Sequence, residues 1–247
     1  MITLKTEQEI DLMREPCAIV RDTLAYIGTK VKPGITTQEL DRYAEEYIRS
    51  RGAIPSCLGY CGYPASICAS VNEVIVHGIP GERFLHEGDI ISIDLCAYKN
   101  GFHGDGARTF AVGEISDEKK KLIRVTEECF WKAIENLRAG TPLYDIGAAV
   151  QKHAEENGFS VVREYVGHGI GREMHEDPSV PNYGKRGTGV RLRAGTVLCI
   201  EPMILAGSRE SRVLADGWTA VTADGKAAAH YENTVVIRED GVEILTL

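Results

Sequence analysis

The chain has 247 residues, of which 43% are hydrophobic and 26% are charged, as in an ordinary globular protein. A net charge of −8 with one short basic run, Lys119–Lys121, provides no footprint for DNA. No apolar run is long enough for a membrane span, and the N-terminal MITLKTEQEI lacks the apolar stretch of a signal peptide, so we expect no membrane partner. Seven cysteines without a CxxC pair indicate reduced thiols and a cytoplasmic location. Three of them, whose spacing does not match a zinc knuckle, are interpreted as small apolar packing groups: Cys57, Cys61 and Cys68.

Two helices are expected near the start of the chain. Thr6 with Glu9, and Thr36 with Glu39, have the spacing of a capping box, which marks the first turn of a helix. The second start is followed by a stripe of mostly apolar residues at helical spacing: Leu40, Tyr43, Ala44, Tyr47 and Ile48. Both segments are therefore predicted to pack one face on a core.

A β-hairpin is expected in SIDLCAYKNGFHGDGARTF, residues 92–110. Asn100-Gly101 is typical of a two-residue type I′ turn, which would place Lys99 opposite Phe102. In that register Asp94 and Asp105 project from the same face as diagonal neighbours. Two carboxylates on a strand that reads as buried are costly, which favours a functional pair over ordinary polar alternation.

The second half of the chain repeats the first. Residues 138–159 align without a gap on residues 32–53, and His153 falls on the apolar stripe, where we interpret it as a satisfied core histidine. Ser116 is expected to open the helix before this repeat, and Thr141-Pro142 to open the repeat with proline at the first helical position.

The repeat extends to the acidic strands. GDIISID, ending at Asp94, is matched by GTVLCIE, ending at Glu201, and each half then places another acid on a later strand, Asp105 or Glu232. We expect an α+β fold of two pseudo-symmetric α/β halves, about 1–115 and 116–247, that share one sheet and one core in a single domain, 1–247. The four acids would meet at the pseudo-twofold axis.

Such a cluster needs counter-charges, because burying one uncompensated carboxylate costs on the order of several kcal/mol of free energy. Two divalent cations would neutralise the four acids, and a histidine would add a nitrogen ligand. Oxygen donors with one imidazole suit manganese, iron(II), cobalt or zinc. Spacing alone does not select the histidine among the candidates His77, His103, His168, His175 and His230. GHGIG around His168 has flanking glycines that would let the side chain approach an ion closely.

The ordered motifs HGIP, SIDL, FHGD, GHGIG, HEDP, EPM and HYENT resemble those of the methionine aminopeptidases, in particular the bacterial type I form. The resemblance covers essentially the whole chain, and the short stretch between GHGIG and EPM leaves no room for the helical insertion of type II enzymes. It implies a pita-bread fold with a curved, mainly antiparallel sheet. It also implies a dinuclear metallo-aminopeptidase, a hydrolase that removes the initiator methionine by means of a hydroxide bridging two divalent metals.

The resemblance assigns roles to individual residues. The metal ligands would be Asp94, Asp105, His168, Glu201 and Glu232. Glu201 would also transfer a proton from the attacking water to the leaving amine, His77 would contact the substrate amide, and His175 would support the tetrahedral intermediate. The methionine pocket would consist of Cys57, Tyr60, Tyr63, Cys68, Met174 and Trp218. Many relatives carry an aromatic residue at the position of Met174 and a histidine at that of Cys61.

The resemblance further implies peptides and nascent chains with N-terminal methionine as substrates, a monomeric state, and the ribosome as a candidate partner. Two alternatives remain open at this stage. A prolidase-like enzyme would cleave before proline, although prolidases usually carry a large additional N-terminal domain. A catalytically silent peptide-binding protein on the same fold would be expected to have lost metal ligands, and here every one is present.

Overall fold

The helices begin where the sequence provides caps, with one exception. The computed structural model describes residues 1–247 and contains four α-helices: α1 (Glu7–Gly28), α2 (Thr37–Ser50), α3 (Asp117–Ile134) and α4 (Tyr144–Glu156). The capping boxes of Thr6 and Thr36 are both formed, and the Ser116 side chain caps α3, as predicted. None of the helices combines the length and apolar character needed to cross a membrane.

The start of α4 differs from the prediction. The helix begins at Tyr144, so Pro142 is not its first residue. Pro142 instead forms an isolated antiparallel bridge with Arg191, and the neighbouring backbone is tied to the same segment by Gly140 N to Leu192 O at 2.8 Å. These long-range bonds tie residues 140–143 to the segment around Arg191, and the helix begins two residues later than predicted.

One antiparallel sheet of nine strands runs through both halves of the chain. Its strands follow the order β1-β4-β5-β14-β9-β7-β8, with β2 also paired to β4 and β15 to β14. Their bounds are β1 (Ile54–Pro55), β2 (Cys68–Val71), β4 (Ile90–Lys99), β5 (Phe102–Ala111), β7 (Gly167–Gly169), β8 (Glu176–Val180), β9 (Val197–Ile200), β14 (Glu232–Ile237) and β15 (Val242–Ile244).

Two small sheets and a short turn complete the structure. One sheet is formed by β13 (Ala228–His230), β10 (Met203–Leu205) and β6 (Ser160–Val161), and the other by β11 (Ser211–Val213), β12 (Ala220–Thr222) and β3 (Val74–Val76). A 3-10 turn, η1 (Tyr60–Gly62), lies between β1 and β2.

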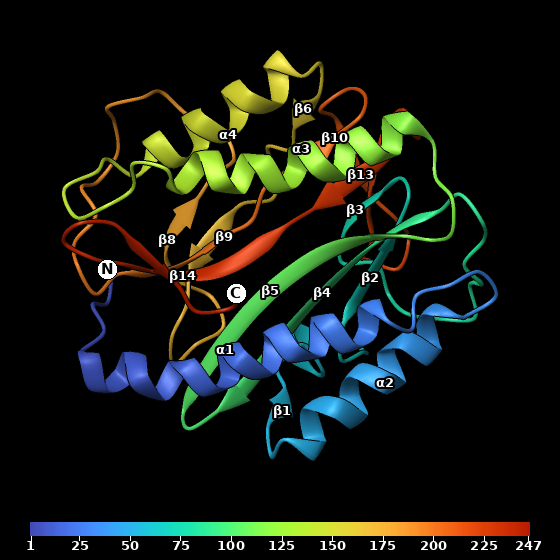
Figure 1. Cartoon of the computed structure of the whole chain (residues 1–247), viewed down its shortest axis with the longest axis horizontal. Helices are drawn as coiled ribbons and strands as arrows, with labels where there is room; N and C mark the ends of the chain where they lie inside the picture. Colours follow the sequence, from blue (N-terminus) through green and yellow to red (C-terminus); the bar gives the residue numbers. More distant parts are fainter.

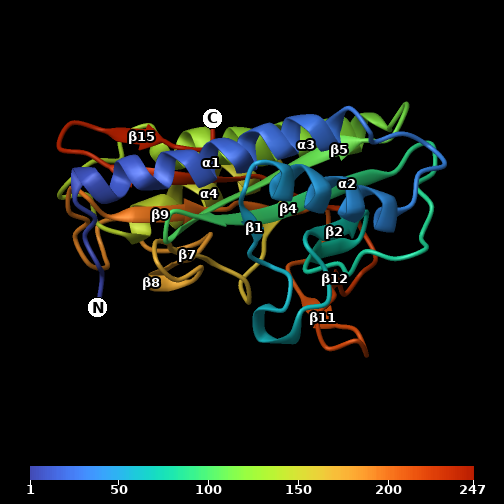
Figure 2. The ribbon, with the colours of Figure 1, turned by 90° about the horizontal axis from the view of Figure 1, so that it is seen from below.

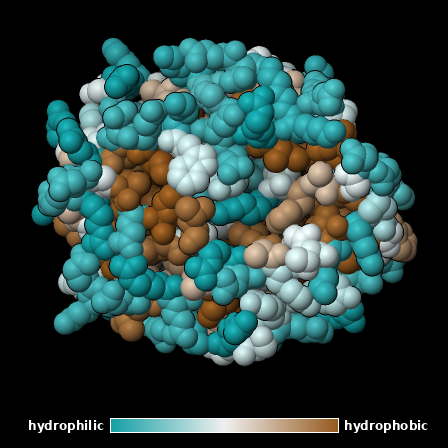
Figure 3. Space-filling model, viewed as in Figure 1, coloured by the Kyte–Doolittle hydropathy of each residue, from teal (hydrophilic) through white to brown (hydrophobic).

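The two halves meet at the pairing of β5 with β14. Figure 1 shows the hairpin β4–β5 beside α1 and α2, and β14 with β9 beside α3 and α4. Figure 2 shows the helices on one side of the sheet and β7, β8, β11 and β12 on the other. On the helical side, apolar residues gather in the band between the two helix pairs, whereas the margins are hydrophilic (Figure 3). The helices therefore cover one face and leave the opposite face for the loops.

The apolar core is less shared than the sequence predicted. One cluster of 23 buried residues belongs mainly to the second half, and a cluster of 18 belongs entirely to the first. A third cluster of 11 joins the halves, for example Cys96 and Phe102 with Val197 and Cys199. The division follows from the helix arrangement, because each helix pair covers its own part of the sheet.

Candidate metal centre

The β4–β5 hairpin has the register that its turn predicts. Asn100 and Gly101 both have positive φ, 57° and 82°, and Lys99 pairs with Phe102. Asp94 is consequently opposite Ala107, and Asp105 is opposite Cys96. Since residues two apart on a strand share a face, Asp94 and Asp105 project to the same side as diagonal neighbours. This prediction is confirmed.

Strand β14 brings a third acid to the same face. Glu232, its first residue, pairs with Ala107 of β5, the residue that also pairs with Asp94 on the opposite side. Thr234, two residues along, fixes this register through its hydroxyl, which accepts from Asp105 N at 3.1 Å and donates to Asp105 O at 2.8 Å. The small Ala107 side chain leaves the space between the two outer carboxylates open.

Strands β9 and β7 supply the remaining predicted ligands. Glu201 directly follows β9, and His168, the central residue of β7, pairs with Cys199. The glycines beside His168 also have a packing role that was not predicted. A Cβ at Gly167 would lie 2.4 Å from Cys199 O, and one at Gly169 would lie 2.1 Å from Asp177 O. They are required because neighbouring backbones approach β7 closely.

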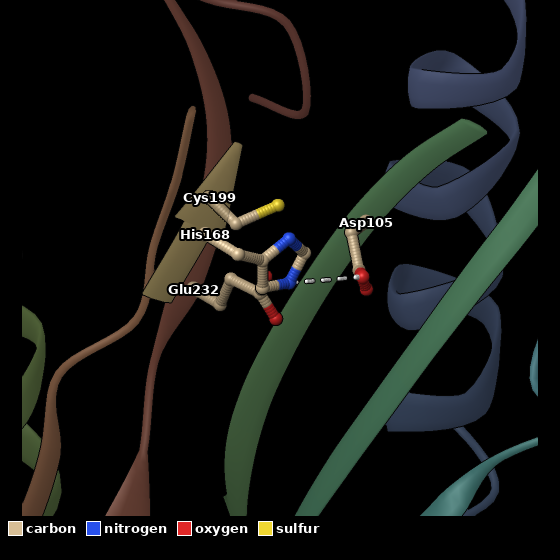
Figure 4. A group of neighbouring side chains, drawn as sticks. All are labelled: Asp105, His168, Cys199 and Glu232. Atoms are coloured by element: carbon tan, nitrogen blue, oxygen red, sulfur yellow. Dashed lines mark ion pairs between the residues drawn. The ribbon is translucent and has the colours of Figure 1, made fainter. Parts of the chain in front are cut away.

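Four side chains, one from each of β5, β7, β9 and β14, converge on one point (Figure 4). One potential ligand atom from each of Asp105, His168, Cys199 and Glu232 lies within 4.8 Å of the others. His168 Nδ1 is 2.9 Å from Gly169 O, and because a carbonyl only accepts, this nitrogen carries the proton. His168 Nε2 therefore has a free lone pair, and it lies 3.9 Å from Asp105 Oδ2.

The other two acids border the same cavity. Glu201 Oε1 lies 3.6 Å from His168 Nε2, and Asp94 pairs with Cys68 of β2, whose side chain also lines the cavity. Asp105 and Glu232 are buried, with exposed fractions of 5% and 2%, whereas Asp94 and Glu201 are half-buried. All four predicted carboxylates thus face one space, as the repeat predicted.

The electrostatics of this cluster are unfavourable without a counter-ion. Burial raises the pKa of Asp94 to about 7. Burial, with the neighbouring carboxylates as the second cause, raises the pKa of Asp105, Glu201 and Glu232 well above the ordinary range. Burial lowers the pKa of His168 to about 3, so its imidazole is neutral. The group consists of acids that resist ionisation and an imidazole that resists protonation.

These residues fit divalent cations. Glu232 Oε1 is buried and has no hydrogen-bond partner, and the His168 lone pair faces carboxylate oxygens. Cations would satisfy both groups and compensate the acids. Cys199 was missed by the sequence analysis, although it precedes Glu201 by two residues and so shares its strand parity. Burial raises the pKa of its thiol well above the ordinary value, which keeps the sulfur protonated and a weak ligand beside the carboxylates.

The cavity continues from the acids into an apolar end. Its volume is about 370 Å³, and its wall includes every residue predicted for substrate binding: Cys57, Tyr60, Tyr63, Cys68, His77, Met174, His175 and Trp218. The Tyr63 and Trp218 rings meet edge-on with centroids 5.1 Å apart. His175 Nδ1 lies 2.7 Å from the Tyr60 hydroxyl, and burial lowers the His175 pKa. Burial also lowers the pKa of His77, to about 4.

Some cavity residues were not predicted. Tyr165 packs edge-on against His77 with ring centroids 5.6 Å apart, and Val76, Glu164 and Val166 also contribute to the wall. The sequence could have indicated residues 164–166 as cavity residues, because the tripeptide EYV directly precedes GHGIG.

Other candidates lie away from the cavity or differ in burial from the prediction. His103 is half-buried beside Ser56 Oγ, at 2.8 Å from its Nδ1, outside the cavity wall. His153 is satisfied by Glu128, at 2.9 Å, but it is half-buried and not a core residue. The packing interpretation holds for the buried Cys68 and is wrong for Cys61, which is exposed in η1 at the cavity wall because that turn projects from the sheet.

Residues 11–239 match the profile of metallopeptidase family M24. The chain belongs to this family. It is 58% identical over 247 residues to a methionine aminopeptidase of Clostridium perfringens, and the alignment covers 100% of this chain and 99% of the relative. A crystal structure of methionine aminopeptidase from Rickettsia prowazekii superposes with a TM-score of 0.99 at 43% identity, covering 100% of both chains. The predicted pita-bread fold of this M24 peptidase is confirmed.

The same fold occurs in solved structures of an Xaa-Pro dipeptidase and of prolidases. An Xaa-Pro dipeptidase from Bacillus anthracis superposes with a TM-score of 0.79 at 24% identity, covering 98% of this chain and 61% of that one. At this identity the likeness shows the fold alone. The two relatives named above that this chain matches over their full length are both methionine aminopeptidases.

Proposed function

We propose that this M24 peptidase is a metal-dependent aminopeptidase that removes N-terminal methionine from peptides and nascent proteins. The observation that carries the proposal is the junction of two environments in one cavity of about 370 Å³. At one end are four carboxylates and a bare imidazole nitrogen, and at the other a wall of aromatic and sulfur-containing side chains. Such a cavity suits a short apolar side chain whose peptide bond lies beside a cation site.

The proposed metal ligands are Asp94, Asp105, His168, Glu201 and Glu232. Four negative charges call for two divalent cations, and oxygen donors with one imidazole suit manganese, iron(II), cobalt or zinc. Asp105 and Glu232, from the central strands β5 and β14, would take part in holding both cations, Asp94 would help to hold one of them, and His168 with Glu201 would help to hold the other. When bound, the cations would acidify a water molecule and polarise the scissile carbonyl.

The protein groups around this site supply the proton transfers and the orientation. We propose that Glu201 accepts a proton from the attacking water and returns it to the leaving amine, a role that the raised pKa of its buried carboxyl supports. His175, oriented by the Tyr60 hydroxyl, would donate to the oxyanion. His77 would orient the peptide nitrogen, held in place by the rings of Tyr165 and Trp218.

Side-chain selection is assigned to the apolar end. The methionine thioether would contact the rings of Tyr63 and Trp218, a favourable sulfur–aromatic arrangement. Cys57, Cys68 and Met174 fill the remaining wall, and a missing or extra methylene in such a slot costs about 1–3 kcal/mol. We further propose one catalytic domain acting as a monomer in the cytoplasm, which the continuous sheet and seven free cysteines support. The ribosome is a candidate partner for an enzyme that acts on nascent chains.

The test uses purified protein loaded with Mn²⁺ or Co²⁺. Methionine is expected to be released from Met-Ala-Ser and not from N-acetyl-Met-Ala-Ser, because the free amine must reach the cation site. Equal turnover of both peptides would refute the free-amine mechanism, and turnover of Ala-Pro without Met-Ala-Ser would favour the prolidase alternative. A protein that binds both peptides and cleaves neither would be the silent binding protein.

The ligand assignment has its own variant. Asp105→Asn is expected to lose metal and activity together, measured by metal analysis and peptide turnover. Asp11→Asn, an exposed acid of α1 paired with Arg14, is the control and should retain both. Full metal content and activity in Asp105→Asn would contradict the assignment.

A further inference from the structure

His230 is a buried histidine to which the proposed mechanism gives no role. It is the last residue of β13, with 1% of its surface exposed, and its Nε2 has no hydrogen-bond partner. A buried polar atom without a partner is uncommon and costs free energy. In the sequence, His230 is a candidate ligand because it lies two residues before Glu232 and so has the same strand parity.

The unpartnered nitrogen lies beside two of the acids, on the side away from the cavity. His230 Nε2 lies 3.7 Å from Glu201 Oε2 and 4.0 Å from Glu232 Oε2. The other oxygen of Glu201, Oε1, lies 3.6 Å from His168 Nε2, so two imidazoles flank this carboxylate. His168 belongs to the cavity wall and His230 does not. His230 therefore approaches the cavity only through the carboxylates of Glu201 and Glu232.

The backbone of His230 is fixed by the other half of the chain. His230 N donates to Thr109 Oγ1 at 2.9 Å, and Thr109 Oγ1 donates to His230 O at 2.8 Å. The Thr109 hydroxyl is in turn 2.8 Å from Ser92 Oγ on β4. These bonds tie β13 to the hairpin that carries Asp94 and Asp105, and they hold the imidazole behind Glu201.

The two imidazoles have complementary hydrogen-bonding roles. A carboxylate only accepts, so the nitrogen next to Glu201 Oε2 is favourable there as an N–H donor. A shift of about half an ångström in either side chain would bring the two atoms to the upper end of hydrogen-bond distance. His168 instead has its proton on Nδ1 and presents a lone pair.

We propose that His230 is a positioning residue: its Nε2–H donates to Glu201 Oε2 and fixes the carboxylate in the orientation that serves the cation site. The inference rests on the proposed function, because it assigns the role of the cation ligand to Glu201. Outer partners that orient metal ligands typically contribute a factor of about 10–100 in metal affinity.

The experiment measures Mn²⁺ binding to the apo-protein by calorimetry. In His230→Leu, which removes the donor, the Kd is expected to rise by about 10–100-fold. In His230→Gln, whose amide restores a donor of similar reach, the rise should stay within about threefold. His103→Leu removes another half-buried, hydrogen-bonded histidine that lies off the cavity and should leave the Kd unchanged. Thermal unfolding of each apo-protein checks folding, and His230→Asn, with a shorter amide, replaces His230→Leu if that variant does not fold.

The outcomes separate the inference from the proposed function. Unchanged Mn²⁺ affinity in a folded His230→Leu or His230→Asn protein overturns the inference. In the Co²⁺-loaded wild type, paramagnetic proton spectra should show one coordinated imidazole. If they show a second coordinated imidazole that disappears in His230→Gln, His230 is itself a metal ligand and the inference is overturned. Wild-type protein that binds Mn²⁺ but releases no methionine contradicts the proposed function and leaves the positioning role intact.

Discussion

Asp94 and Glu232 lie on opposite sides of one alanine, each paired with Ala107 of the strand between them. The two acids come from different halves of the chain, and the small side chain between them leaves an open space. With Asp105 two residues along the same strand, three carboxylates border that space. The alanine is thus as much a part of the site as the acids.

Enlarging Ala107 should displace cations without removing a ligand. Ala107→Val adds two methyl groups to a fully buried position, for which overpacking costs about 1–3 kcal/mol. Mn²⁺ affinity is expected to fall about tenfold or more in calorimetric titrations, while the apo-protein remains folded. Ala107→Gly keeps the space open and should bind Mn²⁺ nearly as the wild type does. Equal affinity of the valine variant would mean that the cations lie elsewhere.

The raised carboxyl pKa values predict how the apo-protein responds to pH. A carboxyl whose pKa is raised in the folded state binds more protons folded than unfolded, so its contribution to stability is lost as pH rises through the folded pKa. For Asp94 this window runs from about 4 to about 7 and slightly above. The histidines with lowered pKa act in the opposite direction below about 6.5, so the net fall should be clearest above that pH.

A variant isolates the carboxyl part of this pH dependence. Apo Asp94→Asn should become more stable relative to apo wild type as pH rises from 4 to 8, by up to about 1 kcal/mol per pH unit within the window. The measurement is urea unfolding at a series of pH values after removal of metal. Saturating Mn²⁺ should abolish the advantage of the variant, since the wild type then gains binding energy. A pH-independent difference between the two apo-proteins would contradict the prediction.

The Tyr60 hydroxyl should influence catalysis through His175. Their atoms are 2.7 Å apart, and the rings lie 5.1 Å apart, so Tyr60→Phe frees the imidazole without opening the wall. We expect kcat for Met-Ala-Ser to fall roughly three- to tenfold, equivalent to one hydrogen bond of about 1 kcal/mol, with Mn²⁺ affinity unchanged. Tyr98→Phe, a half-buried tyrosine of β4 outside the cavity, is the control. An unaltered kcat in Tyr60→Phe would remove this tyrosine from the mechanism.

The N-terminal segment should stabilise the loop that carries His175. Lys5 is buried and bonds to Glu176, the residue after His175, while Lys5 N donates to Gly195 O at 2.7 Å. Lys5→Ala leaves a largely buried carboxylate without its partner and is expected to lower the free energy of unfolding by about 3 kcal/mol. Chemical denaturation measures the loss, and Lys185→Ala, at an exposed position between β8 and β9, should change stability by less than about 0.5 kcal/mol. A similar, small loss in both variants would show that this ion pair does not stabilise the fold.

Local sequence rules predicted the parts of the site that lie on regular strands. The Asn100-Gly101 turn determines the β4–β5 register, and register with strand parity then places Asp94 beside Asp105. The same rules could not place Tyr165 beside His77, because neither residue belongs to a strand and their contact depends on two loops. They also misplaced the start of α4, where long-range backbone bonds outweigh the local preference of Pro142.

Each half of the chain contributes two of the four acids, and the halves adjoin where Gly106 of β5 pairs with Asn233 of β14. Neither half holds the full set of proposed ligands, so the free energy of cation binding at this site would also contribute to cohesion between the halves. Chelation should therefore loosen this junction first, and the backbone amides of the facing strands would report it by faster deuterium uptake while the outer helices remain protected. In the proposed metal centre, the same ions would serve the reaction and hold the two halves of the duplicated chain together.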